Sequence, residues 1–309
     1  MHNNSKKRYY PIKRRPMIDL GQLHKNTPYK NELIPYSLTR TIMEDGLPDI
    51  LFHWHTDMEI IYVHEGQARF HIDTDYFNSE KGDIILIRPN ALHSIHPIEN
   101  TYHYMDAINF QLDLIGYSTK DFAAIHYLHP LYNGQLDFKR VIKPNQPGYT
   151  EIRQTLINSM KIGYYRKTFF ELELKSELLK LLHLLFQYNY VYSSKQSIDG
   201  YRREEKIRTI IDYISEHYQE DLSINLLAEL CGYSPTHFMN FFKKNLGVSC
   251  MNYLIHFRLR KATELLQHST LSVLEIASEV GFKNLSNFNR QFKKIYKTTP
   301  RKYREEMEK

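Results

Sequence analysis

Four histidines and a glutamate in the first third of the chain have the types and the spacing of a single polar site. The first group is His53, His55 and Glu59, and the second is His93 and His96. Imidazole and carboxylate groups hydrogen-bond polar ligands, and they also coordinate transition-metal ions. Residues 53, 55 and 59 share one parity along an extended strand, which would turn all three side chains toward the same interior.

The residues around these groups resemble the two motifs of cupin barrels. Gly46 and Gly66 flank the first group, and Gly82 and Pro89 precede the second, with Ala91 where cupins often have glycine. The resemblance implies a β-barrel whose interior holds both groups, so that His93 could join the three side chains of the first motif.

Three interpretations of this polar group stay open. The first, which we favour, is an effector pocket without metal, in which the hydroxyls of a small molecule such as a sugar exchange hydrogen bonds with these side chains. Its predicted contacts are His53, His55, Glu59, His93 and His96. The second is a divalent transition-metal site with an open position, formed by His53, His55, Glu59 and His93. The third is a set of histidines with structural roles only; no cofactor is predicted.

The elements that would position these residues follow a β pattern from about residue 33 to residue 110. Short runs at 59–63, 68–72 and 83–87 are rich in β-branched and aromatic residues, and glycine and proline interrupt them. We therefore expect a cupin-like effector-sensing domain over residues 31–145.

Helical periodicity follows from near Thr150, with leucines recurring at intervals of three and four residues. This stripe could be core, or it could be a dimer face, which we favour, and it defines a helical linker and dimerisation segment over residues 146–195. The polar stretch 193–197 is the best candidate for a domain boundary. The sequence after it predicts helices joined by short turns.

An internal repeat dominates the last third of the chain. Residues 222–228 recur as 271–277, and the stretch 232–253 recurs as 281–303, with an offset of 49 residues before the glycine and 50 after it. Each copy has the features of a helix-turn-helix motif, in which a glycine follows the first helix where a positive φ is needed. Ser234, with Pro235 at the first helical position, and Asn284 can cap the second helices.

The outer faces of the two second helices carry polar and basic side chains. They are Thr236, Met239, Asn240 and Lys243 in the first copy, and Ser286, Asn289, Arg290 and Lys293 in the second. Arginine can bond guanine in a bidentate way and asparagine can bond adenine, whereas lysines contact phosphates without reading sequence. A long amphipathic helix over residues 251–267 would hold the two recognition helices about one turn of DNA, or about 34 Å, apart.

With this doubled motif, residues 206–304 resemble the AraC/XylS family of bacterial regulators. The resemblance rests on residues 224–234, 276–282 and 288–294 and on the closing Thr299-Pro300-Arg-Lys-Tyr303. It implies binding to promoter DNA, contact with RNA polymerase, a homodimer and, most often, activation. Its base-reading positions correspond here to Thr236, Met239, Asn240, Ser286, Asn287 and Arg290.

Charge and composition agree with this assignment. Residues 200–309, the predicted double helix-turn-helix domain, hold 18 Lys and Arg against 13 Asp and Glu, which suits a polyanionic partner. Residues 1–30 are predicted to form a basic arm. The two cysteines suit a reducing compartment, and without an apolar segment long enough for a membrane or a signal peptide we expect a cytoplasmic protein.

The predicted fold class is α+β, with a cupin-like barrel, a helical segment and two tandem helix-turn-helix motifs. The predicted function is a DNA-binding regulator, with no enzymatic activity, that responds to a small effector. The alternative is a metal-dependent cupin enzyme fused to a DNA-binding domain, and metal analysis of the purified protein would distinguish the two.

Overall fold

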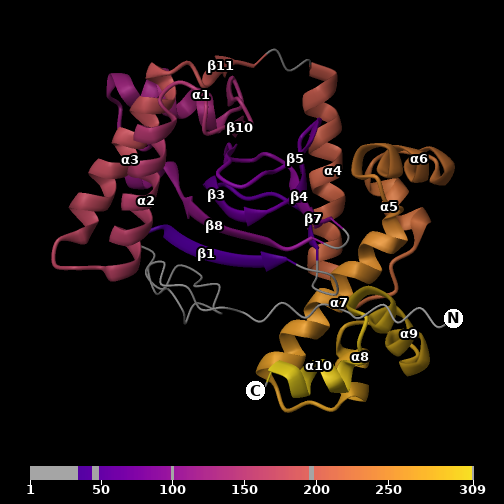
Figure 1. Cartoon of the computed structure of the whole chain (residues 1–309). Helices are drawn as coiled ribbons and strands as arrows, with labels where there is room; N and C mark the ends of the chain where they lie inside the picture. The colour runs from indigo at the N-terminus through magenta and orange to yellow at the C-terminus, as the bar shows by residue number, and fades with distance from the viewer. Residues whose placement is uncertain (1–33, 44–48, 99–100, 195–197, 308–309) are drawn as a thin grey trace, which may run out of the picture.

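The computed structural model describes residues 34–43, 49–98, 101–194 and 198–307. The predicted basic arm of residues 1–30 lies outside the described residues. A β-rich domain comes first and is followed by helices alone, which confirms the α+β prediction (Figure 1). No helix in the described ranges is both long enough and apolar enough to cross a membrane.

Two antiparallel sheets make up most of the first domain. The larger has the order β1 (Tyr36–Met43), β8 (His103–Phe110), β3 (Met58–Gly66), β6 (Ile84–Ile87) and β10 (Val141–Ile142). The smaller has the order β2 (Ile50–His53), β7 (His93–Pro97), β4 (Ala68–Ile72) and β5 (Asp75–Asn78). A separate ladder joins β9 (Leu136–Phe138) to β11 (Val191–Ser193). Side chains of both sheets share one apolar interior, so the β pattern of the sequence is confirmed.

The pleat of β3 explains why Glu59 faces this interior. Ile61 and Val63, which have the same parity, are fully buried in the core between the sheets. Ile60 and Tyr62 have the opposite parity and pack in a second core beneath the helices. The carboxylate of Glu59 therefore lies at the end of an apolar row, on the face of the larger sheet that is turned toward the smaller one.

Two long helices, α2 (Tyr149–Tyr165) and α3 (Phe170–Gln187), cover the outer face of the larger sheet (Figure 1). Three short helices precede them: η1 (Leu112–Ile115), η2 (Ala124–Leu128) and α1 (His129–Tyr132). The leucine stripe that we assigned to a dimer face packs on this sheet, with Leu156, Leu178 and Leu181 almost fully buried. These leucines form core within one chain, and a dimer contact would need other residues.

Seven helices make up the described residues 198–307. They are α4 (Ile198–His217), α5 (Ile224–Leu230), α6 (Pro235–Leu246), α7 (Cys250–His268), α8 (Val273–Glu279), α9 (Leu285–Tyr296) and α10 (Pro300–Met307). The pairs α5–α6 and α8–α9 are the two predicted motifs, and α7 is the predicted connecting helix. Each motif has its own core, closed in the second case by α10.

The first motif also packs against the β-domain. Leu51, Phe52 and Leu92 belong to the same buried cluster as Ile210 of α4 and Tyr253 of α7. The Tyr253 hydroxyl donates a 2.7 Å hydrogen bond to the Phe52 carbonyl. Strand β2 thus belongs to the smaller sheet through its hydrogen bonds, and its residues Leu51 and Phe52 pack with the helical domain.

Candidate functional site

The turns of the two helix-turn-helix motifs have the predicted backbone geometry. Gly232 and Gly281 have φ values of 67° and 83°, in the left-handed region that glycine adopts without strain. The Ser234 hydroxyl accepts from the His237 backbone amide, and the side-chain oxygen of Asn284 accepts from the Ser286 backbone amide at 2.8 Å. Both recognition helices therefore begin where the sequence predicted, with capped N-termini.

The recognition helices, α6 and α9, bury their phenylalanines and expose the opposite face. Phe238, Phe242, Phe288 and Phe292 are fully buried. The exposed residues include Thr236, Met239, Asn240, Lys243, Ser286, Asn289, Arg290 and Lys293, all of them predicted DNA contacts. Asn287 is half-buried and accepts a 2.9 Å hydrogen bond from Arg290. This bond joins the side-chain oxygen of Asn287 to the Arg290 guanidinium, and the family resemblance assigned both side chains to base reading.

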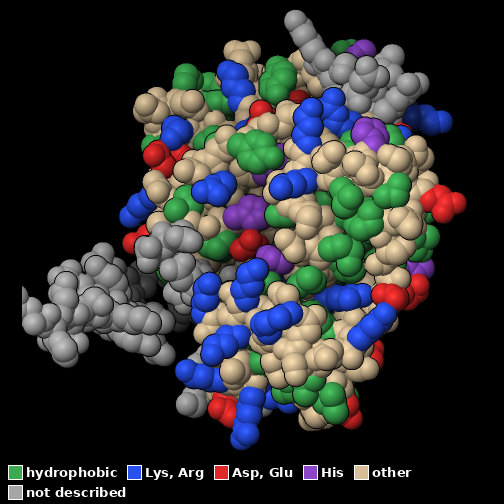
Figure 2. All heavy atoms as spheres, turned by 90° about the vertical axis from the view of Figure 1, so that its right-hand side faces the viewer, with side chains coloured by type: hydrophobic (Ala, Val, Ile, Leu, Met, Phe, Trp, Pro, Cys, Tyr) green, Lys and Arg blue, Asp and Glu red, His purple; other side chains and the backbone are tan. Residues whose placement is uncertain are grey.

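Basic side chains concentrate on this part of the molecule. In Figure 2, lysines and arginines gather over the lower part of the face, at the height where Figure 1 places α8, α9 and α10. Lys293 and Lys294 lie in the last turns of α9 and are exposed. Short polar groups that can reach bases are thus flanked by charges that can reach phosphates.

The histidine–glutamate group also comes together, although not on one strand as the parity argument assumed. His53 ends β2 and pairs in register with His93, the first residue of β7, in the smaller sheet. Glu59 lies on β3 of the larger sheet, and His55 lies in the turn between β2 and β3. The turn leads the chain from one sheet to the other, so the side chains converge between the two sheets rather than along one strand face. The ring nitrogens of His53, His55 and His93 lie within 4.8 Å of one another.

Backbone carbonyls orient all three rings in the same way. The Nδ1 atoms of His53, His55 and His93 lie 2.8, 3.1 and 3.0 Å from the carbonyls of Leu51, Asp57 and Ala91, respectively. A carbonyl oxygen only accepts, so each Nδ1 must carry the proton. In the neutral rings the lone pair is then on Nε2.

Glu59 meets two of these Nε2 atoms. Its Oε2 lies 3.2 Å from Nε2 of His55 and 3.2 Å from Nε2 of His93. Burial favours the neutral form of Glu59, but the neighbouring His55 and His93 outweigh it and hold its pKa well below the usual range. Burial also lowers the pKa of His55, yet its bond to Glu59 outweighs this and raises the pKa above 6.5. Burial, reinforced by His93 and His55, holds the pKa of His53 well below 6.5.

His96 lies outside this cluster. It is three residues beyond His93 on β7, so it points to the other face of the strand. Its Nδ1 lies 2.9 Å from Asp49, and its other ring nitrogen lies 3.0 Å from the Ser94 hydroxyl. The structure thus brings four of the five predicted effector residues together and separates the fifth.

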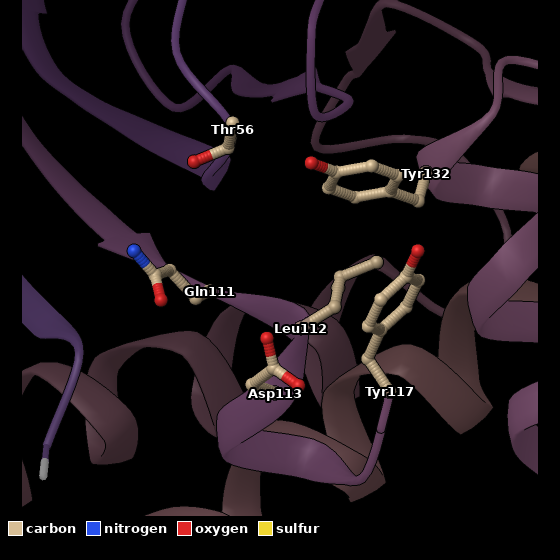
Figure 3. A pocket seen from close by; sticks show the side chains of 6 residues that line it. All are labelled: Thr56, Gln111, Leu112, Asp113, Tyr117 and Tyr132. Carbon is tan, nitrogen blue, oxygen red and sulfur yellow. The ribbon is translucent and has the colours of Figure 1, made fainter. Parts of the chain in front are cut away.

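A pocket of about 180 Å³ opens beside the cluster. Tyr117 and Tyr132 lie on one side of it, and Thr56 and Gln111 lie on the other (Figure 3). Its remaining lining residues are Leu112 and Asp113. Thr56 directly follows His55, and Asn90 connects the two regions, since its amide donates to the His55 carbonyl and its side chain donates to the Tyr132 carbonyl.

The sequence analysis identified none of these lining residues. Five of the six lie in residues 111–132, a segment that carries no recognised motif. Only Thr56 had a usable signal, its place next to His55.

Comparison with known families agrees with both halves of the structure. Residues 41–182 match the model of the AraC-like ligand binding domain, and residues 196–306 match a helix-turn-helix domain model. The chain belongs to the AraC/XylS family. Its β-domain is therefore an AraC-like ligand-binding domain, called the sensor below, and residues 198–307 form the helix-turn-helix domain, called the reader.

Relatives of this AraC-family chain include named transcriptional regulators. An HTH-type transcriptional regulator of Staphylococcus aureus is 34% identical over 124 residues, which are 40% of this chain and 16% of that one. The HTH-type transcriptional regulator YdeC of Bacillus subtilis is 21% identical over 286 residues, covering 90% of this chain and 94% of that one.

Solved structures similar to parts of the chain include two bacterial examples. The C-terminal domain of the two-component response regulator yesN from Fusobacterium nucleatum is 35% identical, covers 32% of this chain and 98% of its own, and has a TM-score of 0.32. ToxT from Vibrio cholerae is 14% identical, covers 87% of this chain and 98% of its own, and has a TM-score of 0.46.

Proposed function

We propose that this AraC-family chain regulates transcription by binding specific DNA sequences through its two recognition helices, in response to a small molecule in the sensor. The observation that carries the proposal is the repeat itself: α6 and α9 each bury two phenylalanines and expose short polar and basic side chains. Because the rigid helix α7 joins them, the two recognition helices are suited to enter the major groove at two points on one DNA molecule.

Selection of bound duplexes from a random DNA library tests this proposal. The full chain should enrich a two-part sequence, and its affinity should fall as salt concentration rises because bound counterions are released from the phosphates. A chain carrying Arg290→Ala should enrich a sequence with one base pair less strictly defined. Enrichment of no sequence by the folded protein would contradict the proposal.

The effector that we propose is a small polyhydroxylated molecule such as a sugar. The pocket beside the cluster is smaller than the roughly 300–1,000 Å³ of sites for drug-sized ligands, which favours a ligand of about monosaccharide size. Its tyrosine rings offer faces for stacking, and Thr56, Gln111 and Asp113 offer hydroxyl, amide and carboxylate partners. His53, His55, Glu59, His93 and His96 remain predicted effector contacts, and among them His55 is next to the pocket.

Thermal shift with a panel of sugars tests the effector class. Gln111→Leu would remove polar partners from the pocket while leaving the cluster untouched, and it should reduce any shift that a sugar produces. Lys120→Ala, an exposed change outside the pocket lining, is the matched control. The sugar proposal fails if no member of the panel stabilises the wild type.

The route from sensor to reader that we propose runs through Trp54, which lies between His53 and His55. Its indole donates a 2.9 Å hydrogen bond to Asp212 on α4, and the Arg208 guanidinium lies 5.5 Å from its ring centre. Arg208 also donates to the Asn90 carbonyl. A ligand that moves the turn of residues 54–57 would thereby move α4, the first helix of the reader, and could favour one arrangement of the two domains.

We further propose that the chain acts as a homodimer and activates transcription by contact with RNA polymerase, as the family resemblance implies. Phe169 and Leu172, about three-quarters exposed beside and on α3, are apolar surface that a second copy could cover. The alternative of a metal-dependent enzyme has less support, because both relatives cited above are named as transcriptional regulators. Sedimentation of the wild type and of Leu172→Lys tests the dimer.

A further inference from the structure

The pocket beside the histidine–glutamate cluster has an acidic lining. Asp113 supplies a carboxylate, and the other side chains that line the pocket are uncharged. His55, directly before the lining residue Thr56, lies 3.2 Å from Glu59, which balances the charge that a proton would bring to its ring. Asp113 would repel anionic ligands such as sugar phosphates and sugar acids. The lining therefore favours a neutral or a cationic ligand.

The carboxylate of Asp113, in the first turn of η1, faces two tyrosine rings. The Ser118 hydroxyl donates to its Oδ1, which leaves Oδ2 to accept from a ligand. Figure 3 shows this carboxylate and the rings of Tyr117 and Tyr132 around the same space. Burial first, then Tyr132 and Asp113, raise the pKa of the Tyr117 phenol, so the field of the carboxylate reaches this side of the pocket.

The two tyrosines are held in place from outside the pocket. Their ring centres are 4.9 Å apart and their planes are tilted by 43°. Nε2 of His129 donates to the Tyr117 carbonyl at 2.9 Å, and the Asn90 side chain donates to the Tyr132 carbonyl. Aromatic faces attract ammonium groups. A ligand gains more from groups that are already in position, because less conformational freedom is lost on binding.

We infer that this pocket preferentially binds an amino sugar, a monosaccharide whose protonated amino group lies between the Asp113 carboxylate and the tyrosine rings. The inference rests on the proposed function, in which the pocket takes a sugar, and it narrows the class of that sugar. An ammonium group has donors and no acceptor, which suits a carboxylate. Sugar hydroxyls both donate and accept, which suits Thr56 and Gln111. A neutral sugar would use the second pair of contacts and leave Asp113 to water.

The expected gain in affinity is modest, because Asp113 is exposed to solvent. An exposed ion pair and an exposed cation–π contact together strengthen binding by about 5- to 10-fold. Salt screens exposed charges, so this gain should shrink as the salt concentration rises. The contacts of sugar hydroxyls with Thr56 and Gln111 involve no net charge and should persist.

The two sides of the pocket also have separate connections to the reader. Thr56 belongs to the turn of residues 54–57, from which the Trp54 indole donates to α4. On the other side, Asn90 donates to the Tyr132 carbonyl and accepts from Arg208 of the same helix. An amino sugar with a hydroxyl at Thr56 and its amino group at the tyrosines would therefore act on both connections.

Calorimetric titration of the full chain with pairs of hexoses and hexosamines tests the inference. The pairs are glucose with glucosamine, galactose with galactosamine and mannose with mannosamine, at a pH where the amino group is protonated. In one pair the hexosamine should bind about 5- to 10-fold more tightly than the hexose. The N-acetylated hexosamine, which has no charge, should lose this gain, and high salt should reduce it.

Two acidic residues of the sensor provide the variant and its matched control. Asp113→Asn keeps the shape and an acceptor for Ser118 but removes the charge, so it should lower the affinity for the hexosamine to that for the hexose. Glu171→Gln removes an exposed negative charge from the first turn of α3, outside the pocket lining, and should leave the preference unchanged.

The possible outcomes separate this inference from the proposed function. Equal binding of hexoses and hexosamines by the wild type, or a preference that persists in Asp113→Asn, would overturn the amino-sugar inference and leave a sugar effector standing. Binding of neither hexoses nor hexosamines would overturn both.

Discussion

The two helix-turn-helix motifs have the same plan but different surroundings. The first motif, α5 and α6, shares its core with Leu51, Phe52 and Leu92 of the sensor. The core of the second, α8 and α9, includes no β-domain residue among those described. Duplication of the motif thus gives one motif that the sensor contacts directly and one that packs on α7 and on the residues that follow α4. A signal of the kind proposed above would reach the first motif through a direct contact.

The largest effect is expected from removing a phenylalanine at this shared core. Phe52→Ala should cost about 3–5 kcal/mol of stability, as for other buried phenylalanines, because Phe52 is 3% exposed. Hydrogen exchange measured segment by segment should rise in β2 and also in α4 and α6. Phe292→Ala, at a fully buried site in the second core, is the matched change, and its effect should stay within α7 to α10. Identical exchange patterns in the two variants would contradict the proposed difference between the motifs.

The glycines of the two turns should respond differently to alanine. Both have positive φ, which costs an alanine roughly 1–2 kcal/mol. A Cβ on Gly281 would also lie 2.7 Å from the Gln219 backbone oxygen, whereas a Cβ on Gly232 would meet nothing within 4 Å. Gly281→Ala should therefore lose about 1–3 kcal/mol more than Gly232→Ala. Urea denaturation measures both free energies of unfolding; equal losses would mean that the Gln219 backbone does not press against the turn of the second motif.

Arg290 and Lys243 should affect DNA binding in different ways. Arg290→Ala should cost about 1–3 kcal/mol and relax the choice of one base pair. Lys243→Ala should weaken binding to all sequences alike and reduce the dependence on salt by about one ion. Fluorescence anisotropy with matched duplexes measures both, with the exposed sensor residue Lys180, changed to alanine, as the control. Unaltered binding in both variants would remove these faces from the DNA interface.

The smallest effect is expected at the polar contact between sensor and reader. Asp212→Asn keeps the shape of the partner of Trp54 but removes its charge, and we expect a loss of about 1 kcal/mol. Burial raises the pKa of Asp212 in spite of its bond to Trp54. A carboxyl group with a raised pKa is destabilised in its charged form. Replacing it with a neutral amide therefore costs less stability. Changed Trp54 emission with intact folding is the expected signature, and an emission spectrum equal to that of the wild type would exclude Asp212 from the route.

Local features could be predicted from the sequence, and contacts across the fold could not. Helix caps and turn glycines depend only on neighbouring residues, as at Ser234, Asn284 and Gly281. Because the motif is repeated, the sequence contains each of these features twice. The meeting of the histidines with Glu59 was predicted with an incorrect reason, because parity says nothing about a turn between two strands. The bond from Trp54 to Asp212 joins residues 158 positions apart, which no periodic pattern indicates.

The leucine stripe shows the same limit of sequence patterns. An amphipathic helix reveals that one face is buried, but not against what. Leu178 and Leu181 pack on the sheet of their own domain. The pocket beside the cluster was missed because Tyr117 and Tyr132 come from a segment of short helices and turns, whose course depends on the sheet against which it packs.

The most direct test of the account is the sequence that the full chain selects from random duplex DNA, measured at low and at moderate salt. We predict two short conserved elements whose centres are about 10 base pairs apart, one for each recognition helix. Lys243→Ala should leave both elements unchanged, and Arg290→Ala should weaken the base preference at one position in one of them. Recovery of a single element, or of no sequence-selective and salt-sensitive binding by folded protein, would contradict the claim that both motifs read DNA.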